Sequence, residues 1–262
     1  LFQGSQSLFG IKTKLQFGKL TVTSVFSQQK SESSSLTVQG GAQTNEFELR
    51  IDQYEENKHI LLAEYFRDNY EVSLSQLPIV NSSVNITKVE VWATNIGAPT
   101  TDNRNIVAFQ DIGEYTPYNN KFQPNMNGQL PDNESNTLRS VVNPEQIRNI
   151  SNITNYLQGD LGMTSGIDYE KVELARKLKP SEYSVNTKLG FISLNTRLNP
   201  DQVLAIAYQY TLVGDPENKI YQVGEFSDEG IRAPNTIMVK LLKSTSVNTN
   251  IPMWDLMMKN VY

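Results

Sequence analysis

LGFISLNTRLNPDQVLAIAYQY, residues 189–210, has the clearest strand pattern in the chain and decides the fold. Phe191 begins a short run of apolar and small residues, and Val203 to Tyr210 mixes β-branched, aliphatic and aromatic residues in near alternation. Between them, Asn199-Pro200-Asp201 has the composition of a turn. The stretch therefore predicts a β-hairpin, and we expect this hairpin to be the central pair of a structural sheet.

Three further stretches are candidate neighbours of that hairpin. Val84 to Thr94 is rich in β-branched and aromatic residues, which favour strands. Lys219 to Glu225 and Thr236 to Leu242 have the same character, and each follows a turn-like segment that contains proline. We expect these three segments to pair with the hairpin.

The N-terminal region predicts another hairpin. Residues 8–17 alternate between apolar and polar side chains, and Leu20 to Phe26 is again rich in strand formers after Gly18. Each strand is about ten residues long, which is the length of an outer-membrane barrel strand. An ordinary amphipathic hairpin on a soluble sheet is the alternative, and both interpretations stay open. Residues 36–39 and 47–51 are candidates for a further short hairpin across Gly40-Gly41.

Helices are predicted where apolar residues recur at helical spacing. Asn143 is a candidate N-cap, with Pro144 at the first helical position. Residues 95–135 are rich in Asn, Pro, Gly, Asp and Thr, and we expect a long irregular region there, interrupted by one apolar segment, Ile106 to Ile112. The predicted helices cover residues 55–69, 135–142, 144–157 and 168–178, with one or two further turns opened by Pro252.

Together these elements predict an α+β fold. We expect a mainly antiparallel β-sheet, of sandwich or jelly-roll type, with several peripheral helices and long irregular loops. We expect residues 6–52 to form a β-hairpin region, for which barrel-derived strands are one interpretation, and residues 53–262 to form an α+β insertion domain. Residues 1–5, Leu-Phe-Gln-Gly-Ser, match a viral 3C-protease cleavage sequence, so we interpret them as an expression-tag remnant.

Composition limits the classes of function. Of the 262 residues, 38% are hydrophobic and 19% charged, a normal balance for a globular chain. A formal net charge of −5 offers no basic patch for a phosphate backbone, so we expect no nucleic-acid partner. The chain has no cysteine, which excludes disulfides, a thiolate nucleophile and cysteine-based zinc sites. No stretch approaches the roughly 18 apolar residues of a membrane-spanning helix.

The sequence offers no catalytic constellation. His59 is the only histidine, so a Ser–His–Asp triad would have to include it, and the chain has no G-x-S-x-G motif. We expect His59 to be a surface or packing residue on the helix of residues 55–69. The adjacent carboxylates Glu55-Glu56 and Asp228-Glu229 point apart, which does not suit acid–base catalysis. We therefore expect no enzyme, with no catalytic and no cofactor-binding residues.

Metal and sugar sites have only weak signals. Residues 102–105, 132–134 and 215–218 have oxygen ligands that suit calcium, but none has the spacing of a dedicated calcium loop. Asp and Asn are also the default turn residues, so we assign no metal site and no cofactor. Aromatic residues could line a sugar- or peptide-binding face, and the alternative is that they fill the sheet core. They are Trp92, Tyr208, Tyr210, Tyr221, Phe226 and Trp254.

Several blocks of sequence together carry a family resemblance. They include FGIKTKLQFGKLTVTSVFSQQKSES from Phe9, LPIVNSSVNITKVEVWATN from Leu77, the stretch of residues 190–226, and KLLKSTSVNTNIPMWDLMMKNVY from Lys240. In these blocks the chain resembles the SprA/Sov family of gliding-motility proteins, which form the outer-membrane translocon of the type IX secretion system. The resemblance spans residues 8–262.

The resemblance implies a non-enzymatic function. The parent would be a very large outer-membrane barrel that exports folded cargo, and this chain would be a non-enzymatic module that shapes or caps its pore. Implied partners are the rest of the translocon barrel, a PorV-type outer-membrane protein, a plug protein and secreted cargo. The family carries over no catalytic residue and no cofactor.

The same resemblance implies a location, whereas the aromatic-bearing sheet and the Asp- and Asn-rich loops suggest a competing function. The parent would be embedded in the outer membrane, and we expect this fragment to be an extracellular cap, with a periplasmic position as the alternative. Its helices and irregular region need water or protein partners for their backbone groups, so they do not suit the bilayer. The alternative function is a cell-surface adhesion module that depends on carbohydrate or calcium.

Overall fold

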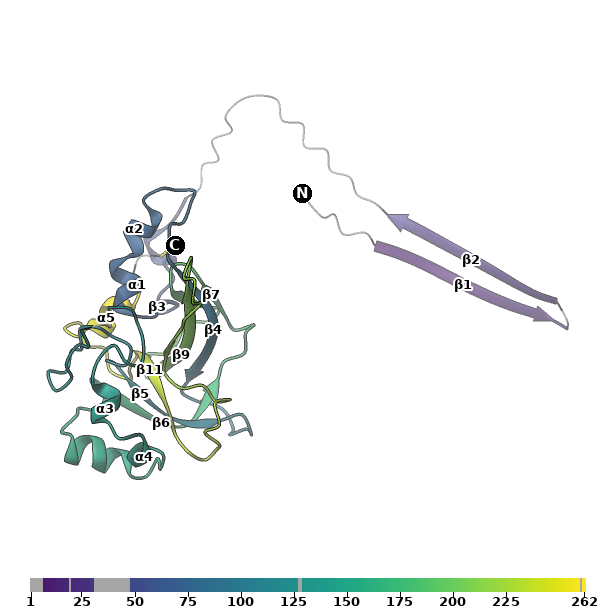
Figure 1. The fold of residues 1–262 in the computed structure, drawn as a ribbon. Coiled ribbons are helices and arrows are strands. Elements are labelled where there is room, and N and C mark those ends of the chain that lie inside the picture. The colour runs from purple at the N-terminus through teal and green to yellow at the C-terminus, as the bar shows by residue number, and fades with distance from the viewer. Residues whose placement is uncertain (1–6, 19, 31–47, 127–128, 260) are drawn as a thin grey trace. The chain divides into compact units, whose positions relative to one another are not determined.

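The structure is a computed structural model that describes residues 7–18, 20–30, 48–126, 129–259 and 261–262. It divides into two compact units, Leu1–Glu48 and Leu49–Tyr262 (Figure 1). The second unit is mostly β, with few and short helices.

The first unit contains a β-hairpin made of β1, Ser7–Phe17, and β2, Leu20–Lys30. The two strands are antiparallel and pair along their full length, with Ile11 opposite Phe26. Gly18, at the turn, has a φ of +59°, in the left-handed region that glycine adopts without steric cost. The two predicted strands are confirmed. The hairpin predicted from residues 36–39 and 47–51 falls mainly on residues outside the described ranges.

Strand β9, Leu204–Leu212, is the centre of the second unit. On one side it pairs along its whole length with β4, Val84–Ala93. On the other side, β11, Ile237–Lys243, pairs with its first residues, and β10, Ile220–Val223, pairs with its later ones. The prediction that these three segments are neighbours of residues 203–210 is confirmed.

The sheet that contains β9 closes into a barrel. Its strand order is β9, β11, β5, β6, β4, and β4 pairs again with β9. The two remaining strands are β5, Arg104–Phe109, and β6, Tyr169–Lys177. All pairings in the ring are antiparallel except that of β11 with β5, which is parallel. The predicted antiparallel character is therefore present, but the sheet is a closed barrel, which removes the open edges that a sandwich would leave.

Alternation along the barrel strands separates two buried clusters. One cluster takes side chains from all five barrel strands, among them Trp92, Ala108, Ala207 and Val239. The other contains the alternate positions, together with residues of the helices and of a smaller sheet. The three-stranded sheet contributes only to the second cluster, which is therefore on the outer face of the barrel, and the first cluster is the barrel interior. Its many small side chains fit a narrow barrel.

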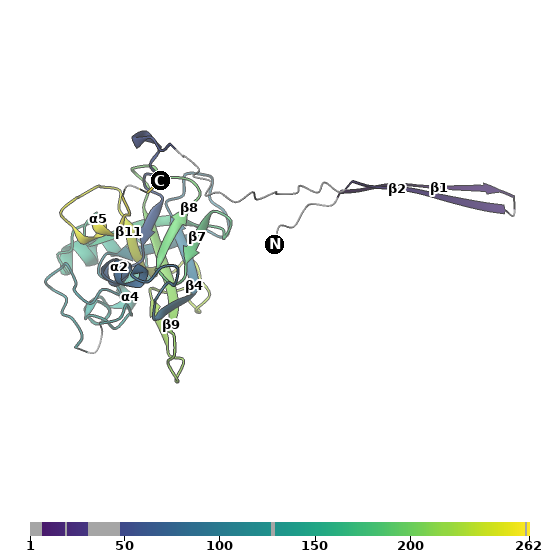
Figure 2. The same ribbon diagram turned by 90° about the horizontal axis from the view of Figure 1, so that it is seen from above.

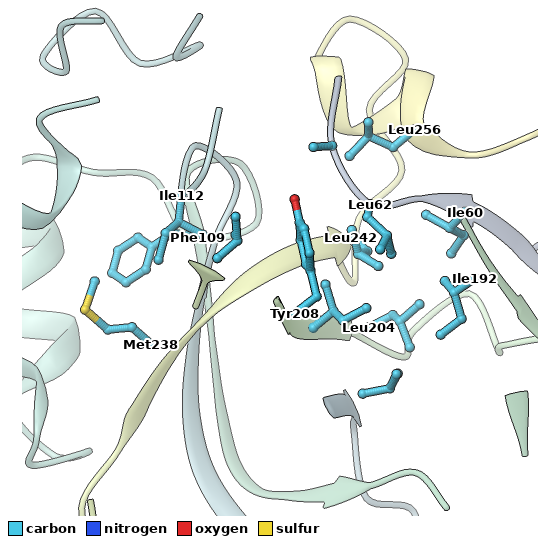
Figure 3. Close-up of a cluster of buried hydrophobic side chains, with 14 of the residues drawn as sticks. Ile60, Leu62, Phe109, Ile112, Ile192, Leu204, Tyr208, Met238, Leu242 and Leu256 are labelled. Atoms are coloured by element: carbon cyan, nitrogen blue, oxygen red, sulfur yellow. The ribbon is translucent and has the colours of Figure 1, made fainter. Parts of the chain in front are cut away.

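The outer cluster joins the barrel to the rest of the second unit. Figure 3 shows Tyr208 of β9 in this cluster, between residues of the barrel and residues of its covering layers. The residues that it draws are all almost completely buried. Among those labelled are Ile60, Leu62, Phe109, Ile192, Leu242 and Leu256.

Strand β8, Phe191–Leu194, belongs to a second, three-stranded sheet. It lies between β3, His59–Leu61, and β7, Tyr183–Asn186, and is antiparallel to both. The predicted hairpin of residues 190–210 is therefore wrong, because β8 and β9 lie in different sheets. Both edges of β8 are occupied, and the chain that follows it is tied elsewhere, since the Asn195 side chain donates to the Ser181 carbonyl.

The predicted helix of residues 55–69 is only partly present. Its first half contains β3, and two short helices follow, α1, Glu64–Asp68, and α2, Tyr70–Leu74. Ile60, Leu61 and Leu62 are consecutive and all buried. A short run of buried residues fits a strand covered on both faces as well as a helix, and periodicity alone does not distinguish the two.

The predicted helix of residues 168–178 is wrong, because these residues form β6. Leu174 has a φ of +51° and sits in a β-bulge, where two residues of β6 lie opposite Asn105 of β5. The Leu174 amide donates to the Asn105 side chain at 3.0 Å. The bulge lengthens the spacing between the buried residues Val172 and Ala175 from two to three, so the strand imitates a helical pattern.

The remaining helices are shorter than predicted. Residues 135–157 contain α3, Leu138–Val141, α4, Pro144–Ile147, and the start of a π-helical turn, η2, Asn155–Asp160. The Asn143 side chain accepts a hydrogen bond from the Glu145 amide at 3.0 Å, so the predicted N-cap is confirmed. The last helix, α5, Pro252–Leu256, begins at the predicted proline. Figure 2 shows α2, α4 and α5 on one side of the barrel strands. Among the described residues, no helix is long and apolar enough to cross a membrane.

Candidate functional site

His59 lies in β3 and joins two distant parts of the chain. Its Nδ1 is 2.8 Å from Oγ of Ser193 on β8, and its Nε2 is 2.7 Å from Oε2 of Glu55. The strand register places His59 directly opposite Ser193. Because an ionised carboxylate only accepts hydrogen bonds, Nε2 donates to Glu55, and in the neutral ring Nδ1 accepts the Ser193 hydroxyl proton. We call this arrangement the Glu55–His59–Ser193 latch.

The latch has the residue order of an activated serine nucleophile, but its setting differs from an active site. Catalysis of acyl transfer also needs donors that hold the oxyanion. Ser193 lies in the middle strand of the three-stranded sheet, where the ladders with β3 and β7 use the backbone amides. We therefore interpret the latch as a tie between residues 55–59 and β8. Sequence reasoning missed Ser193, because it lies 134 positions from His59 and no local pattern marks the pair.

The latch makes stability depend on pH. Hydrogen bonds from Lys58 and then His59 lower the pKa of Glu55 below its ordinary 4.5. A group with a lowered folded-state pKa stabilises the fold above its unfolded pKa, and this contribution disappears as pH falls through the folded value. We expect Glu55→Gln to lower the melting temperature at pH 7 and to have little effect near pH 3, as measured by circular dichroism. An equal loss at both pH values would contradict this, and Glu56→Gln is the matched control.

The Asp- and Asn-rich segments considered for calcium form turns and ties. Asn103 is buried, and its amide donates at 2.7 Å to a backbone carbonyl of β6. Asn133 exchanges hydrogen bonds with the backbone at residue 224, and Asp215 accepts from two amides of its own turn. In the part of the chain that the structure describes, no group of three or more His, Cys, Asp or Glu residues could hold a metal ion.

The adjacent carboxylates separate in the structure. Glu55 faces His59, whereas Glu56 is 3.7 Å from Arg197. Asp228 pairs with Lys88 at 2.8 Å, and Glu229 accepts from a backbone amide at 3.0 Å. Neither pair brings two carboxylates together for acid–base chemistry.

Four of the six aromatic residues considered for a ligand-binding face lie in the core. Trp92, Tyr208, Tyr210 and Phe226 are at most 1% exposed. Tyr210 stacks on Tyr221 with ring centroids 5.1 Å apart, and burial raises the pKa of its hydroxyl. A sugar cannot stack on covered rings, so these residues act as core rather than as a binding face.

A buried ion pair lies between the barrel and the irregular region. Nζ of Lys240, on β11, is 2.6 Å from Oε1 of Glu114, and the two side chains are 1% and 5% exposed. Lys240 also donates to the Gln110 carbonyl, and Glu114 accepts from the Glu64 amide. Burial raises the pKa of Glu114, while Lys240 opposes that change. The pair therefore couples β11 to the chain around residues 110–114.

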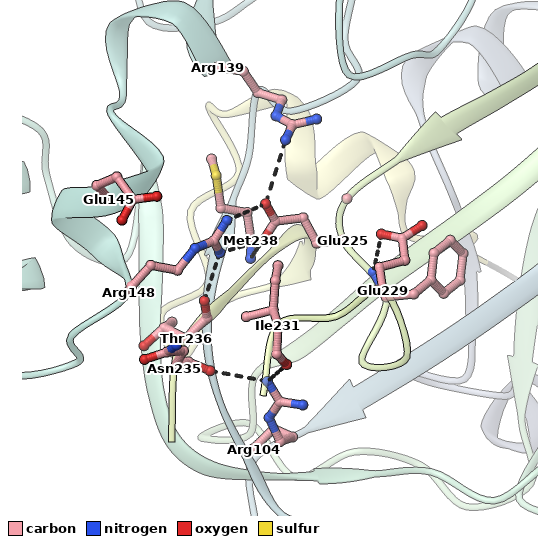
Figure 4. A network of polar contacts seen from close by, with 12 residues as sticks. Arg104, Arg139, Glu145, Arg148, Glu225, Glu229, Ile231, Asn235, Thr236 and Met238 are labelled. Carbon is pink, nitrogen blue, oxygen red and sulfur yellow. Dashed lines mark hydrogen bonds and ion pairs between the residues drawn. The ribbon is translucent and has the colours of Figure 1, made fainter. Parts of the chain in front are cut away.

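A second polar network attaches the short helices to the barrel (Figure 4). Glu225, whose side chain is 6% exposed, accepts two hydrogen bonds from Arg148 at 2.7 and 2.8 Å. Arg139 approaches the same carboxylate at 3.5 Å, and the Met238 amide donates to it at 2.8 Å. The carboxylate thus binds residues near α3 and α4 to β11.

Two cavities lie on either side of residues 177–182, the segment at the end of β6, and Leu178 lines both. We call their surface the two-cavity face. The first cavity, of about 450 Å³, is lined by both polar and apolar residues, among them Ile96, Arg176, Glu182, Asn195 and Arg197. The second, of about 420 Å³, is lined by Trp92, Asp102, Arg104, Lys177, Lys179 and Ser227 among others.

The two-cavity face combines fixed and free charges. Arg176 donates to both oxygens of Glu182 at 2.7 and 2.9 Å, and the backbone N–H of Lys179 lowers the pKa of Glu182. Ile96 and Arg197 project from the first cavity with 76% and 70% of their surfaces exposed. The first cavity therefore places an exposed apolar residue beside charged and amide groups.

A protein-family model matches most of the chain. The SprA_N family model, described as a motility related/secretion protein, matches residues 2–200. The match covers the hairpin of β1 and β2, the barrel strands β4, β5 and β6, and the whole three-stranded sheet. It also includes much of the two-cavity face. No curated protein matches the chain significantly. Because the family model covers well over half of the 262 residues, the chain belongs to the SprA_N family of motility-related and secretion proteins.

Proposed function

We propose that this chain is a non-enzymatic structural and interaction module of the type IX protein-secretion translocon. In this role it shapes or caps the outer-membrane pore and contacts other proteins. The candidate partners are the rest of the translocon, a PorV-type outer-membrane protein, a plug protein and secreted cargo. Membership of a motility and secretion family supports a role in protein secretion.

The observation that carries the contact role is the two-cavity face. Its hollows are rigidly framed, because β4, β5 and β6 of the barrel supply part of their lining. Its chemistry is mixed, with charged groups around exposed Ile96, and it has no catalytic arrangement among the described lining residues. A pre-formed hollow with a polar rim favours binding of a protein segment over chemistry.

Photocrosslinking tests the contact role. A photoreactive phenylalanine analogue placed at Ile96 or Arg197 in the parent protein should give a defined crosslinked product in secreting cells. Val247, which is 60% exposed and does not line either cavity, is the matched control. Mass spectrometry would identify the crosslinked protein. The absence of products from both face positions, or the same products from Val247, would contradict the proposal.

We further propose that the fragment lies on the extracellular side of the outer membrane. The chain has no cysteine, so one introduced thiol reports its own position. Val213 is 68% exposed and suits a Val213→Cys substitution. An extracellular position predicts labelling by a membrane-impermeant maleimide in intact cells, compared with the unsubstituted protein. Labelling only after the outer membrane is permeabilised would instead place the fragment in the periplasm.

A further inference from the structure

The second cavity of the two-cavity face contains a buried cation that has no carboxylate partner among the described residues. Arg104 begins β5 and is 9% exposed. Its Nη2 donates to the Ile231 and Asn235 carbonyls at 2.6 and 3.1 Å, and its Nη1 makes one long contact, 3.4 Å, with the Ser227 carbonyl. Figure 4 shows the guanidinium among these neutral groups. Its Nε has no hydrogen-bond partner among the described residues.

The carboxylate whose charge acts on Arg104, that of Glu90, is already engaged. Glu90, which is 3% exposed, accepts from Lys177 at 2.6 Å and from the amide and hydroxyl of Ser227, both at 2.9 Å. Burial lowers the pKa of Arg104, and Glu90 only partly opposes this. A buried charge is normally paired, because removing it from water is costly. Arg104 therefore has donor capacity that the described part of the protein leaves unused.

The exposed rim of the cavity adds a second cation. Lys179 lines it, and its ammonium group makes no hydrogen bond or ion pair with the described residues. Arg104, Lys177 and Lys179 carry three positive charges, and Glu90 and Asp102 carry two negative ones, which leaves one positive charge in excess. In a hollow with low-dielectric walls, that excess attracts anions more strongly than it would on a flat surface.

We propose that this cavity is a binding site for a small organic oxyanion, that is, a molecule with a carboxylate or phosphate group and a compact polar body. Arg104 and Lys179 would hold the oxyanion, and the hydroxyl of Thr101 lines the cavity beside them. A volume of about 420 Å³ suits a sugar acid or a sugar phosphate better than a bare inorganic ion. The site does not depend on the contact role proposed above, because that role is tested at the first cavity.

Titration calorimetry on the 262-residue chain at low ionic strength tests this site. The probes are glucuronate, glucose 6-phosphate and, as the neutral match, glucose. We expect at least one of the two anions to bind with a Kd of about 1 mM or tighter, and glucose not to bind. Binding of glucuronate alone identifies a carboxylate site, binding of glucose 6-phosphate alone identifies a phosphate site, and binding of both identifies a general oxyanion site.

Charge-reversal variants locate the site. Lys179→Glu should weaken anion binding at least about tenfold, because it replaces an attractive charge at the rim by a repulsive one. Lys188→Glu is the control, with the same change of net charge at an exposed lysine outside this cavity. Arg104 is left intact, because it also holds the loop of residues 227–235. No saturable binding of either anion, or equal weakening by the two variants, would overturn the proposal.

Discussion

Lys240→Met is expected to lower the free energy of unfolding by about 3–5 kcal/mol, the usual cost of leaving one member of a buried ion pair without its partner. Lys240 and Glu114 are almost completely buried, so water cannot replace the lost ammonium group. Methionine keeps most of the volume of the lysine stem, which limits the effect to charge and hydrogen bonding. Urea unfolding followed by tryptophan fluorescence measures the loss.

A double-mutant cycle separates the ion pair from packing. Glu114→Gln alone leaves the Lys240 ammonium buried without a carboxylate, so we expect a loss of similar size. The Lys240→Met/Glu114→Gln protein should be more stable than either single variant, because it contains no unpaired charge. If the two losses were additive instead, the two side chains would not be energetically coupled.

The stability of the Lys240→Met protein should depend on pH. Burial already raises the pKa of Glu114, and removal of Lys240 takes away the group that opposes this. A group with a raised folded-state pKa stabilises the fold below its unfolded pKa, and that stability is lost as pH rises through the folded value. The Lys240→Met protein should therefore lose more stability at about pH 8 than at about pH 5, relative to the unsubstituted chain.

The sequence predicted those strands whose side chains follow one regular pattern. β9 and β11 are near-continuous apolar runs, because both faces of the barrel are covered along them. β4 is rich in β-branched and aromatic residues, and all three strands were predicted as neighbours. β6 was missed, because the bulge at Leu174 gives its buried residues a helical spacing. The separation of β8 from β9 depends on β3 and β7, which contact β8 from distant parts of the chain. No local pattern contains that information.

The candidate sites were less predictable than the fold. Residues 102–105 were considered for their oxygen ligands, whereas the structure points to the cation Arg104, whose burial depends on β5 and on a loop more than a hundred positions later. Lys179 is unremarkable in the sequence and becomes a candidate only because it borders the same cavity. Fold-dependent proximity, rather than residue type, makes both residues candidates.

Glu225→Gln is expected to detach the helical region from the barrel, with a loss of about 2–4 kcal/mol in the free energy of unfolding. Glutamine keeps the shape and an acceptor for the Met238 amide, but leaves Arg148 and Arg139 without their carboxylate. Arg148 is 19% exposed, so water recovers part of the loss, which is why we expect a smaller effect than at Lys240.

Glu225 links residues near α3 and α4 to β11. Its substitution should therefore increase local opening of the helical region more than it increases unfolding of the barrel. Hydrogen exchange should quicken across residues 138–160 in the Glu225→Gln protein, while β4 and β9 keep their protection. Glu145→Gln is the matched control, because Glu145 is exposed on α4 and its substitution removes the same charge close to Arg148. Uniform loss of protection in all strands would show instead that Glu225 supports the whole barrel, and an unchanged exchange pattern would show that the network contributes no stability.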